Sequence, residues 1–496
     1  MSGFRQKTLT GITWSIVSQV GRQGFTFVIG VVLARLLSPR EFGLIAMVTV
    51  ITGFAGIFAE FGFSAALIQK QEVQPEHLSS VFWLNLASGL LLMVILMSSS
   101  LLIAGFYNEP LLVPLTVLIS TNFFFQSASI IQRMLMRKTL NFRTLSMVDV
   151  AMIAVSGGVA IVMAYAGFGV WSLAVRSVVG SAVAMALLWR LSDWRPGFTF
   201  QWQAVKELLG FSLNLLGTRT LGYWARNIDN LLIGRFLGSN PLGVYSRAYS
   251  VLLFPLTNVS LVLSRVMFPS YSIIQEDKRR VKNMHLKITR AIALITFPLA
   301  FGLLVTVEPF VISVFGLHWA EMIPILRVFC IVGLIQSVVS LNGSLYLSQG
   351  RSNLQLGVAF PLRANSLLGI VIGLRWGGIG VAIGYATAAL INFCPSIYFG
   401  GKLIGLTFTE FLRNLSEVFL CGAAMAAAVW GLGLWLPADW PHWGYLATQV
   451  LFGAVVYFLL IYVFKVQAYL DLQTLAMEQW RLHRERQGVP AKEAIA

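Results

Sequence analysis

The chain has 496 residues, of which 57% are hydrophobic and only 11% are charged, and its mean hydropathy is +0.76. This composition excludes a soluble globular protein, because too few polar residues remain to form a hydrated surface. The formal net charge of +16 would by itself suggest a nucleic-acid partner, but the positions of the basic residues explain the charge differently.

Apolar stretches of about twenty residues, the length that crosses the hydrocarbon core of a bilayer, recur along the whole chain. The first follows a short polar start without a small-residue cleavage site, so we predict a retained helix and not a removed signal peptide. We count about fourteen such spans, at residues 10–34, 42–66, 79–105, 110–132, 144–166, 168–189, 208–234, 242–269, 291–314, 320–347, 354–374, 377–401, 414–436 and 443–464.

Basic residues are distributed very unequally between the two alternating sets of connections that join these spans. Twenty-four of them, including all ten lysines, fall in one set, and four fall in the other: Arg35, Arg40, Arg235 and Arg375. Connections rich in lysine and arginine stay in the cytoplasm, so we predict that both termini are cytoplasmic. The net charge is therefore mainly a topology signal, and we expect no nucleic-acid partner.

The span at residues 208–234 carries Arg219, Arg226 and Asp229 inside its hydrophobic length. Their spacing of seven and three residues places them on one face of a helix. A charge at the centre of a membrane costs about 2.5 to 3.5 kcal/mol on insertion scales, so such residues usually face a protein interior or an aqueous cavity. We predict that this helix forms one wall of a substrate pathway; a purely structural ion pair between Arg226 and Asp229 is the alternative.

Arginine is the residue type that we expect to bind substrate. A guanidinium group binds phosphate oxygens through two parallel hydrogen bonds and is less strongly hydrated than an ammonium group, which suits a partly dry anion site. Each such side chain could instead serve only as a polar link between helices. The candidate substrate-binding residues within the spans are Arg22, Arg176, Arg219, Arg226, Arg327 and Arg363. Acidic residues deep in the spans are fewer, and the candidates for ion coupling are Asp149, Asp229 and Glu60.

The chain also contains a weak internal repeat. LARLLSPREFGL, at residues 33–44, aligns with IGRFLGSNPLGV, at residues 233–244, and the alignment matches Gly43 with Gly243. Because a six-helix period preserves orientation, we predict an all-α integral membrane fold with two pseudo-symmetric six-helix lobes around a central cavity, plus two C-terminal helices. The predicted parts are an N-lobe at 1–195, a C-lobe at 196–401, helices 13 and 14 at 402–466, and a cytoplasmic tail at 467–496.

Several runs resemble those of the Wzx-type flippases of polysaccharide repeat units, in the branch that includes colanic acid exporters. They are TWSIVSQVGRQ, LARLLSPREFGL, AEFGFSAALIQKQ, RNIDNLLIGRFLGSNPLGVYSRAY, FPSYSIIQEDKRR and FGLHWAEMIPILRVFCIVG. The resemblance as a whole covers nearly the whole chain in order. The resemblance places the family's cationic cavity on Arg22, Arg219 and Arg226. Glu60 stands where the family pattern leads us to expect aspartate, so a role that needs the shorter side chain is not carried over.

The resemblance implies a protein of the bacterial inner membrane that moves undecaprenyl-diphosphate-linked oligosaccharide from the cytoplasmic to the periplasmic leaflet by alternating access. Its partners would be the lipid-linked oligosaccharide and membrane lipids, with H⁺ or Na⁺ as a coupling ion and polysaccharide polymerase machinery as further candidates. An inside-negative potential favours outward movement of an anion by about 2.3 kcal/mol per charge per 100 mV.

Other functions stay open. A flippase for lipid II or another lipid-linked precursor, and a small-molecule antiporter of the multidrug and toxin extrusion type, are the alternatives, although an organic-cation antiporter would favour an acidic cavity. A membrane glycosyltransferase, polymerase or ligase is less favoured, because the outer connections are short and the sequence contains no Asp-x-Asp motif. We predict a protein that is not an enzyme, with no catalytic residue, metal site or cofactor; the three cysteines show no paired spacing.

Overall fold

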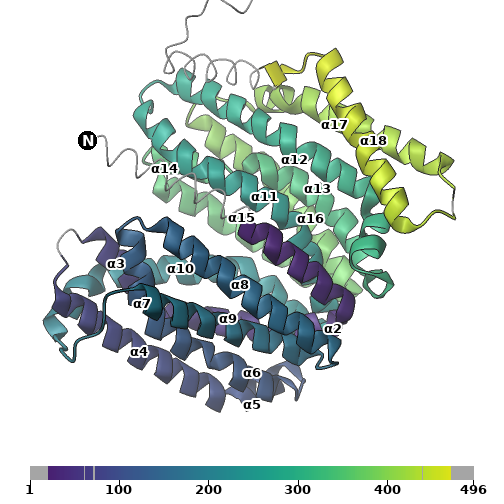
Figure 1. Ribbon diagram of the computed structural model, residues 1–496. Coiled ribbons are helices and arrows are strands. Elements are labelled where there is room, and N and C mark those ends of the chain that lie inside the picture. Colours follow the sequence, from purple (N-terminus) through teal and green to yellow (C-terminus); the bar gives the residue numbers. More distant parts are fainter. Residues whose placement is uncertain (1–20, 61, 71–72, 438, 468, 471–496) are drawn as a thin grey trace, which may run out of the picture. The chain divides into compact units, whose positions relative to one another are not determined.

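In the computed structural model, which describes residues 21–470 except 61, 71–72, 438 and 468, every regular element of the described part is a helix (Figure 1). Ten helical stretches in this part are long and apolar enough to cross a membrane. The predicted all-α integral membrane fold is thereby confirmed. The total of fourteen spans stays a prediction, and residues 10–20 of the first span and nearly all of the predicted tail lie outside the described residues.

The chain forms two compact units, residues 1–246 and 247–496. In the first unit, α10 packs against α2, α3 and α4, and α8 packs against α9. Its described helices are residues 21–36 followed by α2 (Pro39–Glu60), α3 (Phe63–Gln69), α4 (Pro75–Ser98), α5 (Ser100–Tyr107), α6 (Leu112–Ser120), α7 (Asn122–Lys138), α8 (Phe142–Tyr165), α9 (Val170–Leu191) and α10 (Trp202–Leu237). The lobe boundary predicted at residue 195 stays a prediction.

The second unit packs α12 against α13, α17 and α18, and α15 against α16. Its main hydrophobic core lies among α12, α17 and α18 and includes Phe297, Phe411 and Tyr457. Helix α11 (Ser239–Ile273) begins in the first unit and continues into the second, and the helices after it are α12 (Lys278–Val314), η1 (Leu317–Trp319), α13 (Met322–Val339), α14 (Asn342–Ser348), α15 (Ser352–Gly373), η2 (Leu374–Trp376), α16 (Gly377–Lys402), α17 (Phe408–Trp435) and α18 (His442–Val463).

Local sequence explains where several of these helices begin and end. The hydroxyl of Thr407 accepts a hydrogen bond from the backbone N–H of Glu410, and the Glu410 carboxylate accepts one from the backbone N–H of Thr407, so a capping box starts α17. Helix α10 ends at Gly238, whose φ of 91° is accessible mainly to glycine. Helix α7 continues to Lys138, beyond the predicted end of its span at residue 132, so Arg133 and Arg137 are helical residues and do not lie in the connection that was predicted there.

Two glycines from the repeated segments face each other within the first unit. A Cβ atom added to Gly43 would lie 1.7 Å from the carbonyl oxygen of Ser239, and one added to Gly243 would lie 1.8 Å from the carbonyl oxygen of Pro39. Positions 39 and 43 are the repeat partners of 239 and 243, so the contact is reciprocal. Helices α2 and α11 therefore approach backbone to backbone at their first turns.

Two helix junctions also share one local arrangement. Asn122 starts α7, and its side-chain amide donates hydrogen bonds to the Ile119 carbonyl oxygen and the Ser177 hydroxyl on α9. Asn342 starts α14, and its amide donates to the Ser396 carbonyl oxygen on α16. In both units an asparagine amide thus satisfies backbone or hydroxyl groups where an apolar helix is interrupted.

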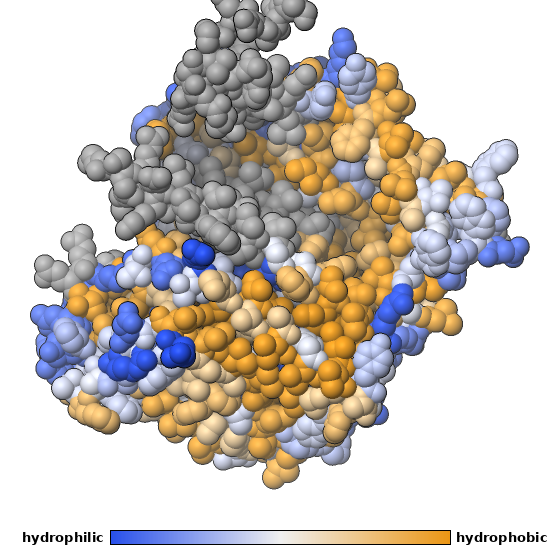
Figure 2. Space-filling model, viewed as in Figure 1, coloured by the Kyte–Doolittle hydropathy of each residue, from blue (hydrophilic) through white to orange (hydrophobic). Residues whose placement is uncertain are grey.

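The outer surface of the helices matches a hydrocarbon environment. Figure 2 shows hydrophobic side chains over most of the visible face of both units, with hydrophilic side chains gathered mainly near helix ends. On α18, Phe458 and Tyr462 lie one turn apart and are 70% and 72% exposed. Such faces would be unfavourable in water but suit contact with acyl chains.

Candidate functional site

The centre of the candidate site is Asp149 on α8, which bridges two arginines. Its Oδ2 atom lies 2.5 Å from Nη1 of Arg22, and its Oδ1 atom lies 2.9 Å from Nη1 of Arg133 on α7. The Asp149 side chain is only 14% exposed. One carboxylate neutralises only one of the two guanidinium charges, so this group of three carries excess positive charge.

The turn between α7 and α8 explains how Arg133 reaches Asp149. Residues 139–141 connect the two helices, Leu140 has a φ of 57°, and the Asn141 side chain accepts a hydrogen bond from the backbone N–H of Thr144 to cap α8. A short connection of this kind makes consecutive helices antiparallel neighbours. Arg133, near the end of α7, and Asp149, near the start of α8, are thereby brought to the same level.

A cavity of about 350 Å³ lies beside this group, and we call it the arginine cavity. Arg133 and Arg137, one helical turn apart on α7, both line it. Its other polar lining residues are Glu60 on α2, Ser64 on α3, Gln126 and Ser129 on α7, and Ser181 on α9.

Glu60 connects Arg219 to the arginine cavity. The Glu60 Oε2 atom lies 3.1 Å from Nη1 of Arg219 on α10, with both side chains about one third exposed. An ion pair with this exposure contributes little to stability because water screens it. Among the described residues, Arg133 and Arg137 thus line the arginine cavity, Arg22 joins it through the carboxylate of Asp149, and Arg219 joins it through the carboxylate of Glu60. These are four guanidinium groups and two carboxylates.

The remaining charges of α10 do not form the ion pair considered from the sequence. Asp229 is 8% exposed and accepts hydrogen bonds from the backbone N–H of Asn230, at 2.8 Å, and from the Tyr245 hydroxyl, at 3.2 Å. Arg226 is exposed and forms no ion pair with any residue that the structure describes. Arg176 on α9 is partly buried and likewise has no ion-pair partner within the described ranges.

The other two predicted arginines belong to the second unit. Nη2 of Arg327 on α13 lies 3.5 Å from Oε2 of Glu308 on α12, and both side chains are more than half exposed. Arg363 on α15 lines a separate cavity of about 300 Å³. The six candidate arginines therefore do not all surround one cavity of either unit.

The predicted cytoplasmic connection after residue 132 contains two residues that line the arginine cavity, Arg133 and Arg137. Their i,i+4 spacing was visible in the sequence and could have indicated one helical face. That signal was lost because the predicted span ended at residue 132, one residue too early to include Arg133.

The second unit also carries an apolar groove of about 980 Å³ between α12, α17 and α18. Pro298, Leu303, Val429 and Phe458 are among its lining residues, and no charged residue of the described part lines it. Such a surface can hold an alkyl or prenyl chain.

A further ionic group lies where α10 starts, just before the predicted span. Oε2 of Glu207 accepts a hydrogen bond from the Lys70 ammonium group and lies 3.2 Å from Nε2 of His77. These two hydrogen bonds, that from Lys70 first, lower the pKa of the Glu207 carboxyl below its ordinary value. The group links α10 to α4 and to the segment that follows α3.

Comparisons with known proteins agree on the type of molecule. Residues 32–324 match the family described as "Polysaccharide biosynthesis protein". The chain is 29% identical to the teichuronic acid biosynthesis protein TuaB of Bacillus subtilis (strain 168), over 97% of this chain and 100% of that one. It is 30% identical to the lipopolysaccharide biosynthesis protein WzxC of Escherichia coli (strain K12), over 87% of this chain and 88% of that one.

Among solved structures, the chain is similar to the lipid II flippase MurJ in an inward closed conformation, with a TM-score of 0.73 and 17% identity over 93% of this chain and 99% of that one. At this identity the likeness concerns the fold, and it agrees with the all-helical membrane architecture. The family match covers more than half of the sequence, and WzxC is a relative at 30% identity over most of its length. The chain belongs to the polysaccharide biosynthesis protein family.

Proposed function

We propose that this protein is a flippase that moves undecaprenyl-diphosphate-linked oligosaccharide from the cytoplasmic to the periplasmic leaflet for polysaccharide export. The observation that carries the proposal is the arginine cavity, where four guanidinium groups meet two carboxylates inside a membrane protein. Placing charge there is costly unless it serves a ligand or a pathway. A diphosphate is the anion that best matches several guanidinium groups.

The names of the relatives support this assignment. TuaB is named for teichuronic acid biosynthesis, WzxC for lipopolysaccharide biosynthesis, and MurJ for flipping lipid II. Each name concerns a glycan precursor or product. A second lipid-linked precursor, such as lipid II, is the nearest alternative cargo, whereas the excess of guanidinium groups speaks against an organic cation.

The apolar groove of the second unit would accommodate the polyprenyl tail during the same cycle. Burying apolar area stabilises such a tail by about 25 cal/mol per Å². The protein would act by alternating access in the bacterial inner membrane with both termini in the cytoplasm, and without catalysing a covalent reaction. Asp149, Asp229 or Glu60 would couple H⁺ or Na⁺ if the membrane potential alone does not supply the drive.

Replacing single arginines in the natural host tests the proposal. Arg22→Ala, Arg133→Ala and Arg137→Ala should each lower the surface glycan at equal protein level, and lysine at the same positions should restore it only in part. Loss of one charge-assisted hydrogen bond is worth about 1.5 to 3 kcal/mol, or roughly 10- to 100-fold in transport. Arg375→Ala, at an exposed arginine that lines neither cavity, is the matched control.

One result would argue against the arginine cavity as the substrate site, and another against the membrane potential as the driving force. One is surface glycan that stays normal in all three alanine variants. The other concerns the driving force: transport into vesicles that responds to a pH gradient but ignores an imposed voltage would refute an electrically driven cycle.

A further inference from the structure

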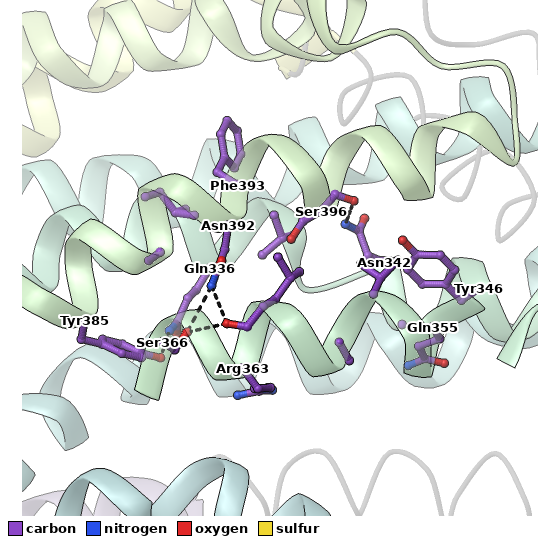
Figure 3. Close-up of a pocket in the computed structure, with 17 residues that line it drawn as sticks. Gln336, Asn342, Tyr346, Gln355, Arg363, Ser366, Tyr385, Asn392, Phe393 and Ser396 are labelled. Atoms are coloured by element: carbon purple, nitrogen blue, oxygen red, sulfur yellow. Dashed lines mark hydrogen bonds between the residues drawn. The ribbon is translucent and has the colours of Figure 1, made fainter. Parts of the chain in front are cut away.

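The second unit contains a polar cavity that the diphosphate does not explain. It has a volume of about 300 Å³ and lies between α13, α14, α15 and α16 (Figure 3). Four carboxamide side chains line it, those of Gln336, Asn342, Gln355 and Asn392, and we call it the amide cavity. Polar side chains within apolar helices are costly and usually serve either helix association or a ligand.

Part of this polarity holds the helices together. Nδ2 of Asn392 donates hydrogen bonds to the Leu362 carbonyl oxygen at 2.9 Å and to the Ser366 hydroxyl at 3.1 Å, and these bonds connect α16 to α15. Figure 3 shows this group at the centre of the lining. Gln336 on α13 donates through Nε2 to the Tyr385 hydroxyl on α16 at 2.8 Å.

Close backbone packing fixes the wall that carries these amides. A Cβ atom on Gly369 would lie 2.4 Å from the Gly384 carbonyl oxygen, and one on Gly373 would lie 2.3 Å from the Gly380 carbonyl oxygen. Helices α15 and α16 therefore meet without side chains between them, and neither can shift without losing that contact. Asn392, whose amide bonds across this contact to Leu362 and Ser366, is thereby preorganised, which lowers the entropy cost of binding a ligand.

Other polar groups of the lining are not used by the protein itself. Gln355 is half-buried, and its side chain makes no hydrogen bond with a residue that the structure describes. The Tyr346 side chain is 5% exposed, and its hydroxyl has no hydrogen-bond partner in the described part of the chain. In Figure 3 both side chains lie with Asn342 at one end of the cavity. Helix association does not account for the Gln355 and Tyr346 side chains, because neither forms a hydrogen bond to another helix of the described part.

The chemistry of the lining is that of a sugar site. Carboxamides and hydroxyls both donate and accept hydrogen bonds, as sugar hydroxyls do, and tyrosine rings offer an apolar face beside a polar tip. Arg363 is the only charged residue among those described as lining the cavity, and Figure 3 shows it apart from the amide group, so an anion is poorly matched. The volume lies at the small end of ligand pockets, about 300 to 1,000 Å³, which suits one ring and not a whole oligosaccharide.

We infer that the amide cavity binds one uncharged hexopyranose ring of the glycan that the protein transports. The inference rests on the proposed function and adds a second recognition site to it. The arginine cavity would hold the diphosphate that all such substrates share, and the amide cavity would distinguish one glycan from another.

The test compares two probes on the full-length protein in lipid nanodiscs. One is geranyl diphosphate, and the other is a set of geranyl diphosphates that carry glucose, galactose or N-acetylglucosamine. The sugar increment is the ratio of the Kd for geranyl diphosphate to the Kd for the tightest glycosylated probe. We expect Gln355→Ala and Tyr346→Phe to lower this ratio about three- to tenfold, the effect of one hydrogen bond, and to leave geranyl diphosphate binding unchanged.

Stability controls separate binding from folding. Tyr346→Phe removes a buried hydroxyl that has no hydrogen-bond partner among the described residues, so the variant should unfold at the same temperature as the parent protein or at a higher one. Thr387→Ala, at an exposed position of α16 whose hydroxyl bonds only to its own helix, should leave the sugar increment unchanged.

A negative result for the sugar site can be distinguished from a negative result for the proposed function. Glycosylated probes that bind no more tightly than geranyl diphosphate, or a sugar increment unmoved by both variants, overturn the amide cavity as a sugar site. Geranyl diphosphate that does not bind, or that binds equally well to Arg133→Ala, overturns the proposed function instead.

Discussion

The contact between Gly43 and Gly243 predicts that an added methyl group at either position separates α2 from α11. In Gly43→Ala the new Cβ atom would meet the Ser239 carbonyl oxygen at 1.7 Å, whereas real Cβ contacts essentially never fall below 3.0 Å. The helices must therefore move apart by at least about 1.3 Å, the difference between these two distances. Both opposing atoms belong to backbone, so no flexible side chain can give way.

The expected cost follows from two opposing terms. Overpacking costs typically about 1 to 3 kcal/mol, and alanine gains about 0.5 to 1 kcal/mol over glycine in a helix. We expect a net loss of about 1 to 2 kcal/mol, which lowers the unfolding temperature of a unit of this size by about 2 to 8 °C. Gly243→Ala should behave alike, and the double variant should lose less than the sum, because the first methyl group already separates the helices.

The effect is measured as the unfolding temperature of the purified protein, monitored by tryptophan fluorescence and by the loss of monodispersity on heating. Gly56→Ala is the control, since it lies on the same helix α2 and a Cβ atom there meets nothing within 4 Å. That variant should be as stable as the parent protein or more stable. Equal unfolding temperatures for Gly43→Ala and the parent, or a strictly additive double variant, would refute the reasoning.

Three further predictions test other parts of the molecule. Asp149→Asn removes the carboxylate that two guanidinium groups share, so geranyl diphosphate should bind about tenfold more tightly while transport slows; weaker binding would contradict this. Glu207→Gln should lower thermal stability at pH 7, and the difference should vanish as the pH falls through the pKa of Glu207, which lies below the ordinary value of a glutamate carboxyl; a difference that persists in acid would exclude the Glu207 charge as its source. Tyr457→Phe should cost about 1 kcal/mol in the free energy of unfolding, because the Tyr457 hydroxyl donates to the Leu294 carbonyl oxygen at 2.9 Å in a buried site. An unchanged unfolding temperature would show that this hydrogen bond adds no net stability.

The helical membrane fold was predictable because hydropathy and span length leave few alternatives. The match of Gly43 with Gly243 was visible as a weak repeat, but only the structure shows that the two glycines touch. Residue type also predicts an anion site, since arginines within apolar spans are costly without a ligand, and this assignment stays a prediction.

The partners of those arginines were not predictable. Asp149 is 127 positions from Arg22 in the chain, and Glu60 is 159 positions from Arg219. No local spacing encodes such pairs, because they depend on which helices become neighbours. The amide cavity was not predictable for a similar reason. Asparagine and glutamine residues on different helices line one cavity only because those helices pack together.

The pairing of arginines with carboxylates bears on how a cargo would be released as well as bound. Four bare guanidinium groups would hold a diphosphate strongly and give it up slowly, and in its absence they would repel one another at a high cost in desolvation. In the proposed cycle, with Asp149 and Glu60 present, an entering diphosphate would exchange one set of anionic oxygens for another, so the charge of the cavity would be partly compensated both with and without cargo. The carboxylates would then act as internal competitors whose return helps to expel the cargo, and for this reason the Asp149→Asn variant is expected to bind more tightly and transport more slowly.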